Sequence, residues 1–300
     1  MLRDTKPRPQ AAGPAAAEEI DLRLGLIGDN IAQSKAPLLH ETAGRLDGLA
    51  VRYDRLVPRE QGLDFGALFA RCAAEGYRGL NITYPYKEQA ARRVAIDDPL
   101  VRAMGAVNTV LFDPAGPAGF NTDYSGFIAA YRQVLGARRA GRVWMIGAGG
   151  VGKAVAFGLL TLGLEALSIV DLDRAKATDL ATRLRAADPQ LPITLAQSPD
   201  ELSGPVDGVI NCTPVGMVGC EGTPLSRDRM RGAGWAFDAI YTPLATQFLQ
   251  DAAAEALTVI SGYELFFHQG VDAWQIFSGR PVEAAQLRRL LTEAGAGPEG

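Results

Sequence analysis

Short apolar runs alternate with longer segments of helical apolar spacing along most of the chain. This alternation is typical of an α/β fold with a largely parallel sheet. The runs predicted as strands are 22–27, 51–57, 79–83, 106–112, 119–121, 143–147, 167–171, 192–196, 207–211, 235–240 and 257–260. The segments predicted as helices are 37–46, 63–75, 85–93, 123–135, 151–162, 262–278 and 282–294. We further expect a hairpin around 114–117 and βα repeats at the strands that begin at 143, 167, 192 and 207.

A glycine-rich motif, Gly147-Ala-Gly-Gly-Val-Gly152, lies between a predicted strand and a predicted helix. Gly147 permits a tight turn, Gly149 permits close approach of a pyrophosphate, and Gly152 permits close packing of helix and strand. Asp171 ends the next predicted strand, where an acid commonly holds a ribose hydroxyl. The alternative is an ordinary strand-to-helix turn, but strand, helix, strand and acid together favour dinucleotide binding.

The order of these elements predicts two domains. A disordered tail is predicted over 1–21, which is rich in Ala, Pro and charged residues. It is followed by a domain over 22–123, which the helices within 262–296 complete. The dinucleotide domain, of Rossmann doubly wound type, is inserted at 124–261. A ligand is expected in the cleft between two such domains.

Composition narrows the function classes. The chain has 300 residues, of which 47% are hydrophobic and 21% charged, and a net charge of −4. That balance is typical of a globular protein and argues against a nucleic-acid partner. No apolar run reaches the ~20 residues of a membrane span, and no signal peptide is evident. Three cysteines, Cys72, Cys212 and Cys220, indicate reduced thiols and a cytoplasmic protein.

Polar clusters stand at the ends of predicted strands in the first domain. They are Asn81–Lys87, Asn108-Thr109 and Asn121–Asp123. Each alone is explained by turn formation, helix capping or a solvated lysine. Three such clusters beside a dinucleotide unit favour a site, because α/β proteins bind ligands at these strand ends.

The chain resembles the shikimate/quinate dehydrogenase family over roughly residues 22–290. The stretches that carry the resemblance, in family order, are Gly25–Gly28, Ser34–His40, Asn81–Lys87, Gly105–Val110, Asn121–Phe127, Gly147–Gly152, Asn211–Met217, Phe237–Thr246 and Gly262–Gly279. It is most similar to the NAD-linked quinate/shikimate branch, since Val170-Asp-Leu-Asp173 stands where NADP-linked members usually carry an Asn-Arg-Thr-type run.

The resemblance implies the roles of individual residues. Lys87 and Asp123 match the catalytic pair, and proton transfer by such a pair complements hydride transfer to a nicotinamide. The implied substrate contacts are Ser34, Thr83, Asn108, Tyr241 and Gln269. The implied cofactor contacts are Gly147, Ala148, Gly149, Gly150, Val151, Gly152, Asp171, Cys212, Thr213 and Gly262. Cys212 lacks an evident neighbouring base, so it is interpreted as a packing residue. Asp171 favours NAD over NADP, because a carboxylate repels a 2′-phosphate.

One loop departs from the family pattern. Ser34-Lys35-Ala36-Pro37 lacks the second hydroxyl that family members usually direct at the substrate carboxylate. Ala36 also leaves room near ring carbon C1, where quinate carries a hydroxyl. A divergent enzyme for another polyhydroxylated or aminated ring acid is therefore one alternative, and a metabolite sensor without activity is another. The expected partner is a small ring hydroxy acid, and a monomer and a homodimer are both open.

Glu264, His268 and Asp272 fall on one face of a predicted helix, at the spacing i, i+4, i+8. A metal site there is not predicted, because the chain has 2 histidines and no matching ligand cluster. His268 is interpreted as a packed helix residue beside the pocket, with Gln269 directed into it.

Overall fold

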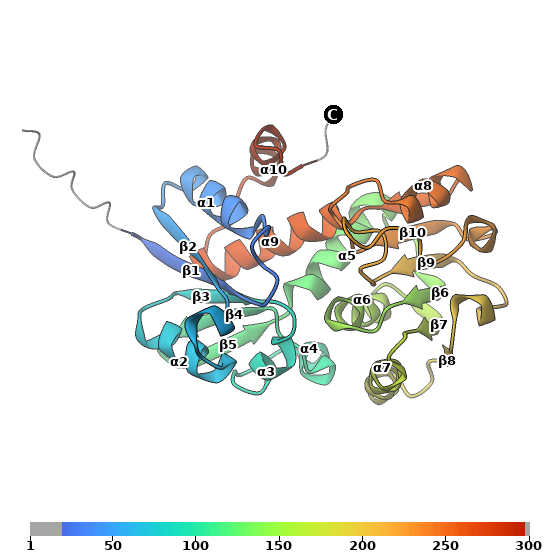
Figure 1. Ribbon diagram of the computed structural model, residues 1–300, viewed down its shortest axis with the longest axis horizontal. Coiled ribbons are helices and arrows are strands. Elements are labelled where there is room, and N and C mark those ends of the chain that lie inside the picture. The colour runs from blue at the N-terminus through green and yellow to red at the C-terminus, as the bar shows by residue number, and fades with distance from the viewer. Residues whose placement is uncertain (1–19, 298–300) are drawn as a thin grey trace, which may run out of the picture.

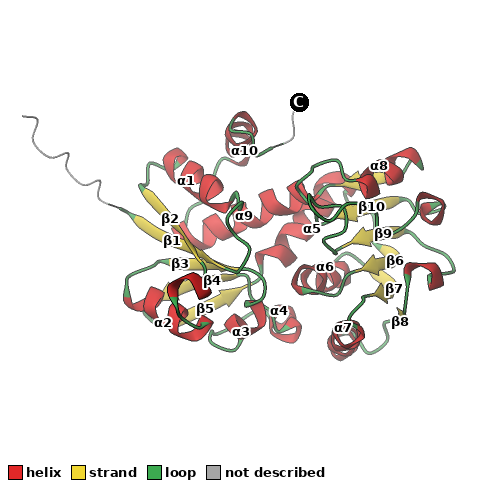
Figure 2. Cartoon of the chain, viewed as in Figure 1, coloured by secondary structure: helices red, strands yellow, loops and turns green. Residues whose placement is uncertain are grey.

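The computed structural model describes residues 20–297 and has two sheets bridged by long helices (Figure 1). Of the predicted tail over 1–21, all but Ile20 and Asp21 lies outside the described residues. The chain forms α-helices and β-strands that alternate over much of its length (Figure 2). The predicted α/β fold class is confirmed by this architecture.

The first sheet has the strand order β2-β1-β3-β4-β5. β1 pairs in parallel with β2 and β3, whereas β3–β4 and β4–β5 are antiparallel. The predicted hairpin is therefore present, although its second strand begins earlier than expected and includes Pro117. The strands are β1 (Leu22–Ile27), β2 (Val51–Leu56), β3 (Gly79–Ile82), β4 (Thr109–Asp113) and β5 (Gly116–Phe120).

The second sheet has the strand order β11-β10-β9-β6-β7-β8, and all of its pairs are parallel. Numbered from its own first strand, this order is 3-2-1-4-5-6 read from the β8 edge, which is the Rossmann arrangement. The order reverses between β6 and β9, so a ligand is expected at the carboxyl ends of those strands. The strands are β6 (Gly141–Ile146), β7 (Leu164–Val170), β8 (Ile193–Ala196), β9 (Gly208–Asn211), β10 (Trp235–Asp238) and β11 (Thr258–Ile260).

Two helices, α5 (Thr122–Leu135) and α9 (Gly262–Ser278), pack together between the sheets (Figure 1). They cross closely at Gly126, where an added Cβ would lie 2.7 Å from the backbone N of Gln269. The remaining helices are α1 (Ala36–Leu46), α2 (Phe65–Ala74), α3 (Lys87–Ala91), α4 (Pro99–Met104), α6 (Gly150–Thr161), α7 (Arg174–Ala187), α8 (Gln247–Ala254) and α10 (Ala284–Glu293). The crossing brings residues at the start of α5 beside residues in the middle of α9.

Several predicted elements are wrong. The helix predicted from 85 begins at Lys87, because residues 83–86 form a turn in which Tyr86 N donates to Thr83 O. The strands predicted at 192 and 207 are not followed by α-helices: β8 leads into a short 3₁₀ turn, and β9 into a loop rich in glycine and proline. Proline and glycine disfavour a helix interior, and this explains both differences. Helices α4 and α8 were not predicted.

The predicted domain borders fall at helix starts in the structure. Residue 123 lies in the first turn of α5, and residue 261 is the N-cap of α9. One large cluster of buried apolar side chains joins α5, α6 and the strands of the second sheet, and two others surround the first sheet. Within residues 20–297, no helix has the length and apolar character needed to cross a membrane.

Candidate active site

Lys87 and Asp123 form a buried ion pair between the two halves of the molecule. Lys87 Nζ lies 2.5 Å from Asp123 Oδ2, and each residue is 9% exposed. Lys87 is the first residue of α3, and Asp123 lies in the first turn of α5. A buried charge is tolerated when it is paired in this way, so each group holds the other in the site.

Local capping fixes the start of α5. Asn121 is the N-cap residue, and its Oδ1 accepts from Tyr124 N at 3.1 Å. Asn121 Nδ2 in turn donates to Ala106 O at 2.9 Å. The helix start is therefore tied to the loop before β4, and this fixes where Asp123 lies.

Asn108 and Gln269 both lie beside the side chain of Thr122. Asn108 Oδ1 accepts from Thr122 N at 2.7 Å, and Asn108 Nδ2 donates to Thr122 Oγ1 at 3.0 Å. Thr122 Oγ1 also lies 3.5 Å from Gln269 Oε1. Thr122 lies in the predicted polar cluster Asn121–Asp123 but was not predicted as a substrate contact, yet it joins two of the predicted substrate contacts and precedes Asp123 directly.

The other predicted substrate contacts, Ser34, Thr83 and Tyr241, lie in three different loops. Thr83 follows β3, and its Cγ2 fills the space beside Gly28, where an added Cβ would lie 2.2 Å away. Ser34 lies before α1 and accepts a hydrogen bond from Ala36 N at 3.2 Å through its Oγ. Tyr241 follows β10 and stacks on Phe266 of α9 with ring centroids 5.1 Å apart, and burial raises its pKa.

The glycine-rich turn has the shape that a dinucleotide requires. Gly147 has φ +102°, and a Cβ on Gly152 would lie 2.2 Å from Gly147 O. By contrast, a Cβ on Gly149 would meet nothing within 4 Å. The turn is therefore closed on its inner side and open at Gly149, where α6 begins and its N-terminus favours an anion. Gly147, Ala148, Gly149, Gly150, Val151 and Gly152 thus fit a pyrophosphate.

Asp171 anchors this turn to the next strand. Its Oδ2 accepts from Ala148 N at 2.6 Å, and its Oδ1 accepts from Asp173 N at 2.7 Å. The carboxylate therefore stands at the carboxyl end of β7, beside the turn. Arg174 and Lys176 begin the following helix and are exposed.

Lys87 also contacts the glycine-rich turn. A Cβ on Gly150 would lie 3.3 Å from Lys87 Cδ and 4.0 Å from its Nζ. The lysine stem thus crosses from the first sheet to the turn that fits a dinucleotide. The ion pair and the turn therefore form one site.

Polar groups after β9 and β10 complete the second-sheet side. Thr213 Oγ1 donates to Asn211 Oδ1 at 2.7 Å, while Asn211 Nδ2 donates to the buried Asp238 Oδ1 at 3.0 Å. Cys212 packs near Gly152, and burial raises the pKa of its thiol. A Cβ on Gly262 would lie 2.4 Å from Ile240 O, so α9 begins directly against this loop. Sequence reasoning gave Asp238 no role, although it lies in the predicted strand 235–240 and in the stretch Phe237–Thr246 that carries the resemblance.

Asp238 makes stability depend on pH. Burial raises the pKa of Asp238 to about 6, although hydrogen bonds from Thr246, Ile240 and Asn211 oppose the rise. A raised folded-state pKa means that this contribution is complete below the unfolded pKa of ~4 and is lost as the pH rises through 6. Between these two pKa values the free energy of unfolding of the wild type should fall as the pH rises. We expect Asp238→Asn to reduce this fall by up to about 3 kcal/mol. Urea unfolding at several pH values checks this, and parallel profiles of wild type and variant would contradict it.

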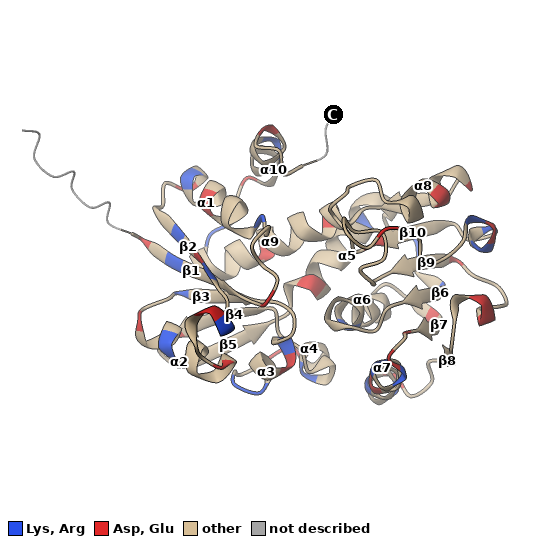
Figure 3. Cartoon of the chain, viewed as in Figure 1, with Lys and Arg blue, Asp and Glu red and all other residues tan. Residues whose placement is uncertain are grey.

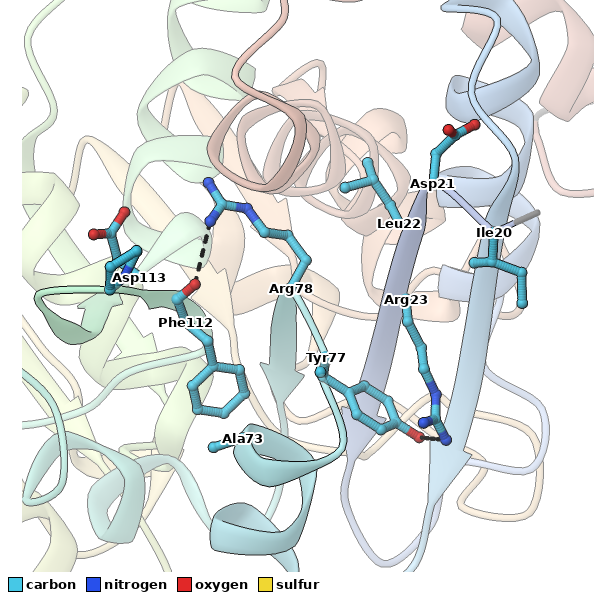
Figure 4. Close-up of a pocket in the computed structure, with 11 residues that line it drawn as sticks. Ile20, Asp21, Leu22, Arg23, Ala73, Tyr77, Arg78, Phe112 and Asp113 are labelled. Carbon is cyan, nitrogen blue, oxygen red and sulfur yellow. Dashed lines mark hydrogen bonds between the residues drawn. The ribbon is translucent and has the colours of Figure 1, made fainter.

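A cavity of about 610 Å³ lies at the other end of the first sheet (Figure 4). It is lined by the start of β1, by Tyr77 and Arg78 before β3, and by Phe112 and Asp113 at the end of β4. Arg78 Nη1 donates to Phe112 O at 3.2 Å across it. No predicted site residue lines this cavity, so it is separate from the ion pair and the glycine-rich turn.

The three α9 residues at metal-like spacing have partners on neighbouring helices, and Glu264 and His268 share Gln133 and lie 3.8 Å apart. Glu264 is bound by Arg288, with Nη1 to Oε1 at 2.7 Å, and Asp272 Oδ2 accepts from Ser125 Oγ at 2.5 Å. His268 Nε2 lies 2.8 Å from Gln133 Oε1, and burial lowers its pKa. The structure therefore assigns these side chains to packing of α9 against α5 and α10.

Comparison with known families finds one matching family model. Residues 26–110 match the shikimate dehydrogenase substrate binding domain. This stretch includes Lys87, all of β2 and β3, the end of β1 and the start of β4.

Similar proteins extend the match across most of the chain. A shikimate dehydrogenase (NADP⁺) of Pseudarthrobacter chlorophenolicus is 35% identical, over 92% of this chain and 96% of the relative. A quinate/shikimate dehydrogenase (NAD⁺) of Corynebacterium efficiens is also 35% identical, over 88% and 95%. The solved quinate dehydrogenase of Corynebacterium glutamicum in complex with NAD superposes with a TM-score of 0.85 at 33% identity, covering 92% of this chain and 100% of that one.

Proposed function

The chain belongs to the shikimate dehydrogenase family, and from this premise we propose that it oxidises a ring alcohol of quinate or shikimate with NAD, using Lys87 and Asp123 for proton transfer. It is an NAD(P)-dependent oxidoreductase that acts on CH–OH groups, like its named relatives. Our proposal specifies the preferred nucleotide, the ring acid that serves as substrate and the roles of the site residues. We propose that the first sheet holds the ring acid and the second sheet holds the nucleotide.

The observation that carries this proposal is the position of Lys87. Its Nζ is paired with Asp123 at 2.5 Å, and its stem lies against Gly150 of the glycine-rich turn. A general acid or base acts within hydrogen-bond reach of the reacting hydroxyl. Lys87 is a titratable group on the first-sheet side that contacts the turn expected to hold the nucleotide.

The residues of the chain then divide the work. In oxidation, a bound nicotinamide would accept the hydride. In oxidation, the amine of Lys87 takes the proton from the substrate hydroxyl; in the reverse direction, its ammonium returns a proton to the carbonyl oxygen. Asp123 holds Nζ in place through the ion pair. Thr122, Asn108 and Gln269 orient the ring hydroxyls around that point.

The nucleotide preference follows from Asp171. Its carboxylate at the end of β7 favours a ribose 2′-hydroxyl and repels a 2′-phosphate. We expect wild type to have the higher kcat/KM with NAD, and Asp171→Asn to shift the NADP/NAD ratio of kcat/KM by about tenfold toward NADP, because it removes one repulsive charge. Steady-state kinetics with both nucleotides checks this. A wild-type preference for NADP would contradict the assignment.

The acid preference follows from Ala36. Its backbone N donates to Ser34 Oγ. The family resemblance implies that its methyl group replaces a second hydroxyl that would reach a substrate carboxylate. We expect Ala36→Ser to lower the KM for shikimate by about tenfold, since a hydrogen bond to a charged group contributes roughly 1.5–3 kcal/mol. The KM for nucleotide should not change and serves as the control. An unchanged shikimate KM would show that this loop does not bind the carboxylate.

Ala36 also favours a second candidate substrate, another polyhydroxylated or aminated ring acid. Initial rates of nicotinamide reduction, measured side by side with quinate, shikimate and a panel of such acids, decide between the candidates. Good rates with quinate or shikimate support the proposed function. Rates with neither, in a protein that still binds NAD, would assign the site to a different acid.

A further inference from the structure

Lys153 is the second buried lysine, with Lys87, in the described part of the chain. It lies in the first turn of α6, where its backbone N donates to Gly149 O at 2.9 Å. Its Nζ donates to Glu88 Oε1 and to Asp179 Oδ2, each at 2.6 Å. The lysine side chain is 6% exposed, whereas the carboxylates are 50% and 42% exposed. Two acids thus reach inward to neutralise one buried cation, as a buried charge requires.

These acids come from opposite halves of the molecule. Glu88 lies in α3, which follows the first sheet, and Asp179 lies in α7 of the second sheet. Both helices carry charged residues of both signs (Figure 3). Asp179 also accepts from Arg183 Nε at 2.9 Å, and Arg183 Nη1 donates to Ala103 O at the end of α4 at 3.3 Å. The chain of polar contacts therefore leaves the first half at Glu88 and returns to it at α4.

The ion pair between Lys153 and Glu88 lies beside the proposed site. Glu88 follows Lys87 directly, and Lys153 lies three residues after Gly150. Lys87 Cδ contacts Gly150, at 3.3 Å from an added Cβ, and Glu88 bonds to Lys153 beside that contact. Burial alone would raise the pKa of Asp179, but hydrogen bonds from Lys153 and Arg183 outweigh it and hold that pKa below its usual range. Asp179 therefore holds Lys153 from the α7 side, while Glu88 binds the same Nζ from α3.

We propose that Lys153 is a positioning residue that ties α3 to the glycine-rich turn and so sets the separation between the nucleotide and Lys87. The proposal rests on the proposed roles of Lys87 and of that turn. Loss of Lys153 leaves the carboxylates of Glu88 and Asp179 facing one another, and their repulsion separates the halves. Loss of Glu88 removes the tie but leaves Lys153 paired with Asp179.

The test uses Glu88→Gln, Lys153→Met and the double variant. Glu88→Gln changes a half-exposed side chain, so it is informative even where Lys153→Met fails to fold. We expect Glu88→Gln to lower kcat/KM by about tenfold and to raise the KM for both nucleotide and ring acid, because both sites face the widened gap. The double variant should be no worse than Lys153→Met alone, since the two residues act as a unit. Lys153→Arg, which keeps both pairs, should restore most activity.

Arg289→Met is the matched control, since it breaks an exposed i,i+4 ion pair with Glu293 in α10. It should leave kcat/KM within about twofold of wild type, because such pairs contribute little. Small-angle X-ray scattering provides the second readout: Glu88→Gln should have a larger radius of gyration than wild type and the control. This readout reports the separation of the halves whichever residue transfers the proton, so it distinguishes failure of the tie from failure of the proposed function. An unchanged scattering curve, or kinetic effects of Glu88→Gln and Lys153→Met that multiply in the double variant, would overturn the proposal.

Discussion

Replacing Lys87 with methionine should lower kcat by about 10²–10⁴-fold, the range that proton transfer by a side chain contributes. Methionine keeps most of the stem that packs against Gly150, so the shape of the site is retained. Only the group paired with Asp123 is lost. Steady-state rates at saturating quinate or shikimate and NAD measure the change in kcat.

Nucleotide binding separates this result from misfolding. We expect the Kd for NAD to stay within about threefold of wild type, because the backbone of the glycine-rich turn is unchanged. Arg71→Met, which removes an exposed charge from α2 on the outer side of the first sheet, should leave kcat unchanged. A Lys87→Met enzyme with wild-type turnover would show that another group transfers the proton.

Replacing Gly152 with alanine should raise the Kd for NAD by about 100-fold or more. The new Cβ would lie 2.2 Å from Gly147 O, and backbone atoms cannot yield as a flexible side chain does. The turn must open, and α6 must move away from β6. We also expect a loss of about 1–3 kcal/mol in unfolding free energy, the usual cost of forcing an extra methyl into a packed site. Fluorescence titration with NAD and thermal unfolding measure both effects.

Gly149→Ala is the contrasting variant. Nothing lies within 4 Å of its added Cβ, so the Tm of the protein without nucleotide should be that of wild type. The methyl group nevertheless occupies space at the N-terminus of α6, where the phosphates are expected. We therefore expect weaker NAD binding without a change in stability. Wild-type affinity in Gly149→Ala would show that the phosphates do not approach this residue.

Local patterns predicted most of the fold. β1 and α9 have the predicted bounds, and the glycine motif, the strands on each side of it and Asp171 predicted the dinucleotide unit. The errors occur where local signals compete. The predicted βα repeats implied helices after β8 and β9. Pro199, Pro214 and the glycines near 216–222 prevent those helices. Short helices such as α4 leave too little periodicity to be recognised.

The candidate site was predicted less completely, for a different reason. Lys87 and Asp123 stand beside recognisable motifs, so resemblance to a family identified them. Thr122 and Asp238 also lie in such stretches but were given no role, and Lys153 lies outside them, because its role depends on partners distant in the sequence. Lys153 hydrogen-bonds to Glu88, which lies 65 residues away in the sequence. From the sequence alone, a lysine in a helix is expected to be exposed to solvent. Tertiary contacts decide such roles.

A structure of the protein with NAD and shikimate or quinate tests the central claim most directly. The distance to measure is that between Lys87 Nζ and the oxygen of the ring hydroxyl nearest the nicotinamide. We predict about 2.6–3.2 Å, which is hydrogen-bond reach for proton transfer, with Asp123 still paired to Nζ. A reacting hydroxyl that lies beyond such reach of Lys87 and bonds to another titratable group would contradict the account.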